Sequence, residues 1–588
     1  MKEFLKYVVA TIVGLLVFGI IITALGVMSL VGMVASTSAT QSVPKNSVLV
    51  LKLDGSLDEQ ASDNLMNQLN GTTSIGLNDM LKAISKAKKS DKIRGIYIEA
   101  QGLRTNFAQL QELRGALADF RKSGKKIISY GETYGQGEYY LASVSDKVLL
   151  NPQGMILWRG LGGTSFYYKD ALEKLGIKVI ACKVGKYKSL PEMFTEERMS
   201  EANREQTERY LQLAWQQILT DVGKSRGIST VSLNTYADSL YALAAPELLL
   251  KRKMVDGLCY TDEVKDQVKK FFGLDKDDDI SQVSASDLCN APEDDEDDHV
   301  AIYYMQGDIV DQMLPSSFGS NEPVIDATKV CPDLEELADD DDVKAVVIRI
   351  NSGGGSAYAS EQIWHQIEKL KQKKPVVVSM SGMAASGGYY ISCGANYIFA
   401  EPTTLTGSIG IFGLFTDASG LLSNKLGIKT DEVKTNRNTN ILSLGQPLTP
   451  EQIGLLQAYI DRGYFTFKSR VAQGRKMTMA QVEERAQGHV VMGSDALKMK
   501  LVDELGGIDK AVAKAAKLAK LNKFSTVEYP VPSSWMEQLL NSGSGRNSLL
   551  DEQLKLYLGA LYEPVMMLGQ IEHLDMLQAR APIILINN

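Results

Sequence analysis

The sequence predicts an α/β protein built from two similarly folded halves and preceded by a membrane-spanning helix. Three observations support this prediction. Short apolar strands recur in the same order in both halves, helical patterns lie between those strands, and the chain opens with a long uncharged stretch. The length of 588 residues is too great for one hydrophobic core, so more than one domain is expected.

The uncharged stretch covers residues 7–34 and is rich in Val, Ile, Leu, Gly and Phe. A helix of that length spans roughly 40 Å, enough to cross a bilayer with tilt. Lys2 and Lys6 precede it and the next basic residue is Lys45, which places the N-terminus in the cytoplasm and the bulk of the chain outside it. A cleaved signal peptide is the alternative, but its apolar region covers only about 7–15 residues. We assign residues 1–35 to a cytoplasmic tip and signal-anchor, and residues 36–46 to a linker.

Four predicted strands in the first half have counterparts in the second half. From the second strand to the fourth the two series keep a constant offset of 250 residues. A constant offset through several elements implies two similarly folded domains. The strands cover residues 48–53, 93–98, 126–129 and 147–152, matched by 300–305, 343–348, 376–379 and 397–402.

Amphipathic helices are predicted between these strands, at residues 107–122 and 361–373. Each places its apolar residues on one face at helical spacing: Leu110, Leu113, Leu117 and Phe120 in the first, and Ile363, Trp364, Ile367 and Leu370 in the second. Alternation of strands and helices predicts a largely parallel sheet covered on both faces. The predicted domains cover residues 47–273 and 299–530, with an acidic linker at 274–298 and a C-terminal tail at 531–588.

Composition excludes several classes of function. The net charge of −8 argues against a nucleic-acid partner, because phosphate binding needs a basic face. The five cysteines are widely spaced and form no CxxC pair, so they predict neither a zinc site nor a disulfide framework. We expect no metal and no organic cofactor.

Ser386 is the first candidate catalytic residue. It follows a predicted buried strand and lies among Ala384, Ala385, Gly387 and Gly388, small residues that allow a sharp turn and expose a hydroxyl. A turn that merely packs a helix N-terminus would have the same composition. The equivalent position in the first half holds Gln136, so the repeat itself does not require serine.

A glycine run at 353–355 ends the second strand of the second half. Consecutive glycines there free backbone N–H groups to face a ligand oxygen, as an oxyanion hole requires. A flexible turn is the alternative. The first half has residues 101–105 (Gln-Gly-Leu-Arg-Thr) instead and has lost both the glycine run and the serine. Their joint loss indicates that the run serves Ser386 rather than the fold.

Lys188 is the candidate base, and it lies in the first half. A free lysine has a pKa near 10.4, but burial disfavours its charged form and can lower the pKa by several units. The short apolar run at 179–182 precedes it, and about Thr439 stands at the equivalent place in the second half. Spacing alone leaves Lys183 and Lys186 open as alternatives. A nucleophile and a base divided between two copies predict one composite active site.

Several motifs together resemble the long, two-domain form of signal peptide peptidase A, a membrane-bound Ser/Lys protease family of the ClpP/crotonase-like superfamily. The resemblance runs from the N-terminal anchor to about Val527. The chain departs from the family at Gly353, where the family usually has Pro, and at the pair Val491-Met492. The motifs that carry it are Asn351-Ser-Gly-Gly-Gly-Ser356, Ala384-Ala-Ser-Gly-Gly-Tyr389, Thr406-Gly-Ser-Ile-Gly-Ile-Phe-Gly413, Gly185-Lys-Tyr-Lys-Ser189, Gly488-His-Val-Val-Met-Gly493 and Leu501-Val-Asp503.

This resemblance implies two tandem ClpP/crotonase-like domains and a role for each matched residue. Ser386 corresponds to the nucleophile, Lys188 to the general base, and Ser408 to a serine that orients the lysine amine. Gly355 and Gly387 correspond to the oxyanion hole. The resemblance also implies remnant signal peptides as substrates, a homotetramer, no cofactor, and a single-pass protein of the bacterial inner membrane with its catalytic domains on the periplasmic side.

Two other functions are compatible with parts of the sequence. A crotonase-type acyl-CoA enzyme would share the fold and the oxyanion hole but would need no Ser/Lys pair. A catalytically idle membrane scaffold that binds peptides would need neither Ser386 nor Lys188. The sequence leaves open whether these two residues meet within one chain or between subunits, which residues the cleft prefers, and what the C-terminal tail does.

Overall fold

The computed structural model describes residues 43–61, 74–274, 280–291, 296–312, 323–443, 445–531 and 576–582, together with Lys6 and Gly14. Apart from those last two residues, the expected transmembrane helix lies outside this set. Among the residues described, no helix is both long and apolar enough to cross a membrane. The amphipathic part of the tail, including Leu554 and Leu558, also lies outside the described residues.

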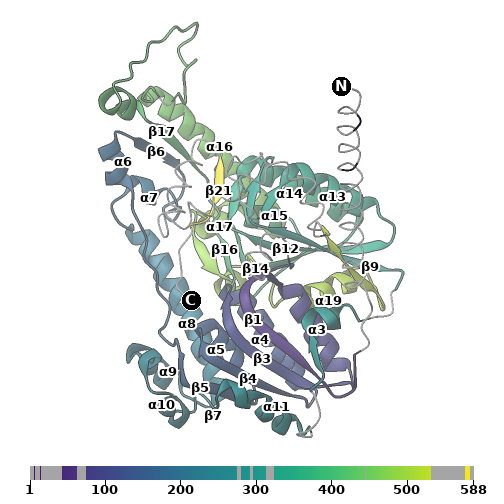
Figure 1. Cartoon of the computed structure of the whole chain (residues 1–588). Coiled ribbons are helices and arrows are strands. Elements are labelled where there is room, and N and C mark those ends of the chain that lie inside the picture. The colour runs from purple at the N-terminus through teal and green to yellow at the C-terminus, as the bar shows by residue number, and fades with distance from the viewer. Residues whose placement is uncertain are drawn as a thin grey trace.

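The first half forms a parallel sheet with the strand order β2-β1-β3-β4-β5-β7. Strand β8 pairs in parallel with residues 48–50 of β1. All four strands predicted in this half are present. Figure 1 shows strands β1, β3, β4 and β5 of this sheet in purple and blue, below strands β12, β14 and β16 of the second half. The strands are β1 (Ser47–Asp58), β2 (Ser74–Gly76), β3 (Ile93–Arg104), β4 (Lys126–Tyr134), β5 (Lys147–Ile156), β7 (Gly257–Leu258) and β8 (Gln282–Ser284).

The second half repeats this arrangement. Its parallel strands follow the order β20-β9-β12-β14-β15-β19, which matches the order β8-β1-β3-β4-β5-β7 of the first half. Strand β14 also pairs in parallel with β16, and β16 pairs antiparallel with β18. The predicted duplication is therefore present in the strand order. These strands are β9 (His299–Gln306), β12 (Val343–Ser352), β14 (Val376–Ala385), β15 (Tyr397–Ala400), β16 (Leu405–Gly407), β18 (Val490–Met492), β19 (Glu504–Leu505) and β20 (Ser525–Tyr529).

Helices cover both faces of the second sheet. Along β9, Val300 and Ile302 belong to the core shared with the first half, whereas Ala301 and Tyr303 face the core beneath α13 and α14. This alternation explains why the strands are apolar on both sides. The helices are α3 (Leu77–Lys89), α4 (Phe107–Arg121), α5 (Gln136–Ala142), α6 (Lys169–Leu175), α7 (Glu192–Thr195), α8 (Glu201–Arg226), α9 (Thr230–Asp238), α10 (Pro246–Lys251), α11 (Val264–Phe272), α12 (Ala285–Cys289), α13 (Ala327–Asp339), α14 (Ala357–Lys373), α15 (Gly387–Ser392), α16 (Pro450–Arg475), α17 (Met479–Arg485), α18 (Gly493–Lys498) and α19 (Ile508–Leu518).

A third sheet combines segments from both halves and from the tail, in the order β11-β10-β13-β21-β17-β6. Its strand β6 (Lys178–Lys183) comes from the first half and pairs antiparallel with β17 (Phe412–Asp417) of the second, with Cys182 opposite Gly413. Figure 1 shows β6 and β17 side by side, away from the first sheet. The other members are β10 (Asp308–Val310), β11 (Val324–Asp326), β13 (Gly354–Ser356) and β21 (Gln578–Arg580).

Two segments differ from the sequence-based division of the chain. Residues 282–289, inside the stretch assigned to an acidic linker, form β8 and α12, with Val283 and Leu288 buried against the first sheet. The acidic residues that suggested a linker flank this short apolar element. Residues 178–183, assigned to the first domain, lie in a sheet with the second.

A buried ionic cluster joins the two halves. Arg349, on β12, donates hydrogen bonds to Glu59 at 2.7 Å, to Glu112 at 2.6 Å and to Ser379 at 2.8 Å. The guanidinium and both carboxylates are almost completely buried. Burial by itself would lower the pKa of Arg349, but the Glu112 and Glu59 carboxylates outweigh it and raise that pKa above its ordinary value. Arg349 therefore stays charged and couples the halves.

We expect Arg349→Met to lower the free energy of unfolding by about 3–5 kcal/mol, because it leaves two buried carboxylates without their counter-charge. Urea denaturation monitored by circular dichroism measures the change. Arg437→Met is the matched control, since Arg437 pairs with Glu451 on the surface and its loss should cost less than about 1 kcal/mol. Equal losses in the two variants would contradict the structural role given to the cluster.

Candidate active site

Ser386 lies between β14 and α15 and is fully buried. Its backbone has φ 55° and ψ −112°, a conformation that residues with a side chain rarely adopt. Its N–H donates to Gly407 O at 2.8 Å, which helps to hold the turn. The small neighbours are needed for close packing: a methyl group added at Gly387 would lie 2.7 Å from Ser360 Oγ, and one at Gly388 would lie 2.8 Å from Ser352 O.

Lys188 reaches Ser386 within the same chain. Strand β6 carries the backbone into the second half, and Lys188 follows five residues after the strand ends. Its Nζ lies 2.6 Å from Ser386 Oγ, and the residue is fully buried. Two glycines permit this approach. A methyl group at Gly185 would lie 2.3 Å from the Gln487 carbonyl carbon, and one at Gly488 would lie 2.6 Å from Lys188 N.

Burial lowers the pKa of Lys188 well below that of a free lysine. The physical cause is desolvation, because a charged ammonium loses its hydration in this interior. The Phe412 ring lies beside the amine, with its centre 6.0 Å from Nζ. The amine is therefore neutral over a pH range in which an exposed lysine is protonated.

Ser408 holds the amine from the other side. Both its Oγ and its backbone O lie 3.1 Å from Lys188 Nζ. Ser408 is fully buried, has φ 50°, and its N–H donates to His489 O at 2.7 Å. The strained turn after β16 thus places a hydroxyl and a carbonyl oxygen toward the amine that contacts Ser386.

The two neighbouring lysines do not reach Ser386. Lys186 is exposed, and its Nζ lies over the Tyr187 ring. Lys183 Nζ donates to Lys188 O at 3.4 Å and pairs with Glu192 at 3.8 Å. Of the three lysines that spacing left open, the structure brings Lys188 to the serine.

The glycine run places backbone amides beside Ser386. Gly354 has φ 101°, and a methyl group there would lie 2.6 Å from Gly387 N, so β13 approaches the start of α15 closely. A methyl group at Gly355 would lie 2.0 Å from Ile309 O on the neighbouring β10. Glycine is therefore required at both positions. Gly353, the departure from the resembled family, has more room, since a methyl group there would lie 3.3 Å from Met383 Sδ.

The positions matched to Ser386 and Lys188 in the opposite halves hold Gln136 and Thr439. Gln136 occupies the position matched to Ser386 and is almost completely buried. Its Oε1 accepts from Arg159 N at 3.1 Å and Gly160 N at 3.0 Å, and its Nε2 donates to Gly160 O at 3.2 Å. Thr439, matched to Lys188, lies exposed in a loop and donates to Asn436 O. In these copies the residues serve local structure.

Gln206, to which the sequence assigns no role, binds the backbone of the segment that carries Lys188. This buried residue of α8 donates to Tyr187 O at 3.1 Å and accepts from Val490 N at 3.1 Å. The Tyr187 ring also stacks on His489, with centroids 4.4 Å apart. Gln206 lies 18 residues beyond Lys188 in an ordinary amphipathic helix, so no local pattern marks it.

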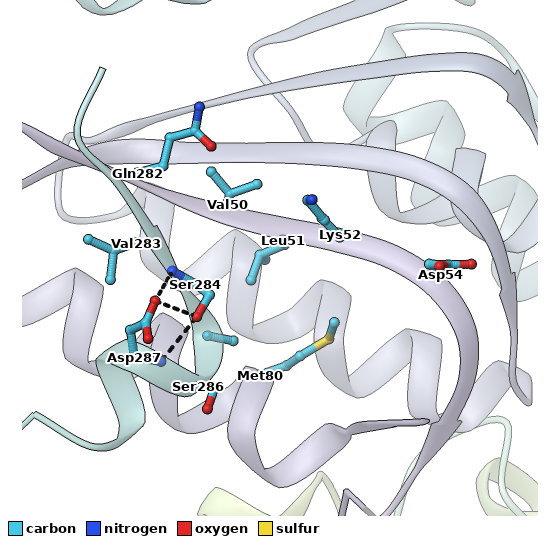
Figure 2. A pocket seen from close by; sticks show the side chains of 11 residues that line it. Val50, Leu51, Lys52, Asp54, Met80, Gln282, Val283, Ser284, Ser286 and Asp287 are labelled. Atoms are coloured by element: carbon cyan, nitrogen blue, oxygen red, sulfur yellow. Dashed lines mark hydrogen bonds between the residues drawn. The ribbon is translucent and has the colours of Figure 1, made fainter. Parts of the chain in front are cut away.

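A cavity of about 450 Å³ lies elsewhere, on the first half between β1, β8 and α12. Figure 2 shows its lining, in which Ser284 and Asp287 hydrogen-bond to each other. These bonds form the N-terminal cap of α12, so the polar groups are satisfied within the fold. We assign no catalytic part to this cavity.

Comparison with known proteins agrees with the architecture. The model of "Peptidase family S49" matches residues 119–275 and again 368–522, and the model of "Clp protease" matches residues 317–404. The two S49 matches fall one in each half, as expected for tandem domains of this type.

Three curated proteins match most of the chain. "Protease 4" of Salmonella typhi is 36% identical over 87% of this chain and 85% of its own. "Protease 4" of Haemophilus influenzae is 33% identical over 82% of this chain and 80% of its own. "Serine protease SPPA, chloroplastic" of Arabidopsis thaliana is 30% identical over 88% of this chain and 76% of its own. The chain therefore belongs to peptidase family S49 as a serine protease of the long SppA type, with two S49 domains.

Proposed function

We propose that this serine protease uses a Ser386/Lys188 dyad to cleave remnant signal peptides at a membrane. The observation that carries the proposal is the 2.6 Å contact between Lys188 Nζ and Ser386 Oγ, in a place where both residues are fully buried. A buried, neutral amine beside a serine hydroxyl is the arrangement that activates a serine without histidine.

The proposed reaction is acyl transfer. Neutral Lys188 accepts the Ser386 proton while Oγ attacks a peptide carbonyl, and Lys188 then protonates the leaving amine. Water, activated by the same amine, hydrolyses the acyl-enzyme. Ser408 orients the amine through its two contacts at 3.1 Å. No metal or organic cofactor takes part in these steps.

The backbone N–H groups of Gly355 and Gly387 form the proposed oxyanion hole. They flank the turn that holds Ser386, and the tight approach of Gly354 to Gly387 N supports this assignment. Each such donor contributes roughly 3 kcal/mol of transition-state stabilisation.

The remaining parts of the proposal concern location and assembly. The uncharged residues 7–34 would anchor the protein as a single-pass protein of the bacterial inner membrane, with both domains on the periplasmic side. Short apolar peptides left in the membrane after preprotein cleavage are substrates within reach of such an anchor. A homotetramer is the proposed assembly.

We expect Ser386→Ala and Lys188→Ala each to abolish peptide hydrolysis and labelling by a fluorophosphonate probe, because one removes the nucleophile and the other its base. Lys186→Ala is the matched control; it changes an exposed lysine two residues away and should keep both activities. Labelling that survives both dyad changes would remove the proposed dyad. A wild-type protein that binds peptides without hydrolysing them would favour a catalytically idle membrane scaffold. Turnover of acyl-CoA thioesters would favour a crotonase-type acyl-CoA enzyme.

Activity should rise with pH as Lys188 loses its proton, because the base must be neutral. Burial lowers the pKa of Lys188, so the rise should be complete well below the pKa near 10.5 of an ordinary lysine. The dependence of kcat/KM on pH measures this directly. A rate that keeps climbing through the ordinary lysine pKa would show that Lys188 is not the desolvated base.

Ser408→Ala should lower kcat about tenfold with little change in KM, because one hydrogen bond to the amine is lost while the cleft stays intact. Ser392→Ala is the control, since the Ser392 hydroxyl is also buried but donates to Gly388 O at 2.6 Å within α15. Steady-state kinetics with a fluorogenic peptide separates kcat from KM. Equal kcat in both variants would leave Ser408 without a positioning role.

A further inference from the structure

Gln206, on α8, bridges the two parts of the molecule that meet at the Lys188 amine. Its Nε2 donates to Tyr187 O at 3.1 Å and to Ser189 Oγ at 3.2 Å, so it contacts the residues before and after Lys188. Its Oε1 accepts from Val490 N at 3.1 Å, in β18 of the second half. The residue is only 1% exposed. One buried amide therefore ties the segment that carries Lys188 to β18.

The strand that Gln206 contacts also supports Ser408. Strand β18 pairs antiparallel with β16, which Ser408 directly follows. His489, just before β18, accepts the Ser408 N–H on its carbonyl oxygen at 2.7 Å. Ser408 in turn contacts the Lys188 amine through its hydroxyl and its carbonyl oxygen, each at 3.1 Å. Gln206 thus connects the backbone around the base to the backbone that presents the two oxygen atoms to its amine.

The orientation of the Gln206 amide is fixed by a second buried residue, Asn203, one turn earlier on α8. Asn203 Nδ2 donates to the Glu192 carboxylate at 3.1 Å, and Asn203 Oδ1 accepts from Gln206 Nε2 at 3.2 Å. Glu192 is 2% exposed and also accepts from Ser200 Oγ at 2.7 Å. Because the carboxylate accepts, the Asn203 amide turns its oxygen toward Gln206, and the oxygen of Gln206 is left for Val490 N.

Loss of this bridge would take the acceptor from the buried Val490 N–H and a donor from Tyr187 O. Buried polar groups that lose a partner are costly unless water replaces it. Water there would lie beside Lys188, since a methyl group at Gly488 would already lie 2.6 Å from Lys188 N. Burial lowers the pKa of Lys188, and hydration would favour its charged form again. The bridge therefore helps to keep the amine neutral.

The charged groups near the segment leave desolvation as the cause of the lowered pKa of Lys188. Lys183 and Glu192 pair with each other at 3.8 Å. Burial lowers the pKa of His489, so its imidazole is already neutral where a lysine titrates. The titratable groups that face the segment are Lys183, Lys186 and Tyr187 on the segment itself, Glu192 on α7, Glu205 on α8, Tyr464 on α16, and His489 before β18.

We propose, on the basis of the function proposed above, that Gln206 is a positioning residue for the Ser386/Lys188 dyad. It holds the Lys188 segment against β18 and so keeps water away from the amine. It touches no substrate and takes no proton. Without it the same reaction proceeds, but a higher pH is needed before Lys188 is neutral.

The test is the dependence of kcat/KM on pH for Gln206→Leu, measured on full-length protein in detergent with a fluorogenic peptide. The midpoint of the rise should move to higher pH by about one unit, the equivalent of one lost hydrogen bond. Activity should approach that of the wild type on the alkaline plateau. A residue with only a structural role would lower the thermal midpoint of unfolding without moving the pH midpoint.

Gln109→Leu is the matched control. Gln109 is also a buried glutamine, 2% exposed, and its Nε2 donates to Glu59 at 2.8 Å in the cluster between the halves. Its replacement should lower the thermal midpoint of unfolding and leave the pH midpoint unchanged. A pH midpoint that moves equally in Gln109→Leu and Gln206→Leu would overturn the positioning role, and so would an unmoved midpoint in folded Gln206→Leu.

Ser189→Ala provides a milder variant that removes only the 3.2 Å contact with Gln206 Nε2. It should move the pH midpoint in the same direction by less. Combined with Gln206→Leu it should add no further shift, because that contact is already lost. If Gln206→Leu does not fold, Ser189→Ala decides the question, and an unmoved midpoint there would overturn the inference.

The wild-type protein separates failure of this inference from failure of the proposed function. A wild type that is labelled by a fluorophosphonate and gains activity with pH, beside folded variants with the same pH midpoint, would overturn the role of Gln206 and leave the dyad standing. A wild type that shows neither labelling nor peptide hydrolysis would overturn both.

Discussion

The site depends on one contact: an uncharged lysine amine held against a serine hydroxyl, away from water. Keeping Lys188 neutral costs the folded protein about 1.4 kcal/mol for each unit by which its pKa falls. The rest of the structure must supply that free energy. The segment that carries Lys188 is held by the pairing of β6 with β17 and by Gln206, which donates to Tyr187 O and accepts from Val490 N.

Duplication explains how such a contact can be built between distant parts of the chain. Two copies of the same sheet are joined by an almost completely buried cluster around Arg349, which couples them. One copy then contributes the serine and its glycine run, and the other contributes the lysine, five residues after strand β6, which pairs with β17 of the second copy. In the first copy Gln136 bonds to backbone where Ser386 would stand, so that position stabilises a turn.

Much of this architecture could be predicted from the sequence, because local patterns specify it. Short apolar runs indicated the strands, and a constant offset between the two series indicated the duplication. Spacing could not choose among Lys183, Lys186 and Lys188; that choice came from the resemblance to a family, and the structure brings Lys188 to Ser386. The pairing of β6 with β17 is a contact between distant segments and leaves no local pattern. The short strand β21 has none either, since a three-residue strand in a tail carries no periodicity.

The acidic stretch between the halves shows the limit of reasoning from composition. Its charged residues indicated a linker, yet Val283 and Leu288 lie within it and are buried against the first sheet. Two apolar residues in the right register outweigh the charged residues around them, because charged neighbours can point to solvent while the apolar side chains pack.

The charge of the Lys188 amine can be observed directly. Carbon NMR of protein labelled at the lysine ε-carbon reports the charge of each amine, and the signal missing from Lys188→Met identifies the residue. If the amine is desolvated, the Lys188 signal already has the shift of a neutral amine at neutral pH, while the exposed lysines still carry their protons. A Lys188 signal that titrates together with those exposed lysines would contradict it.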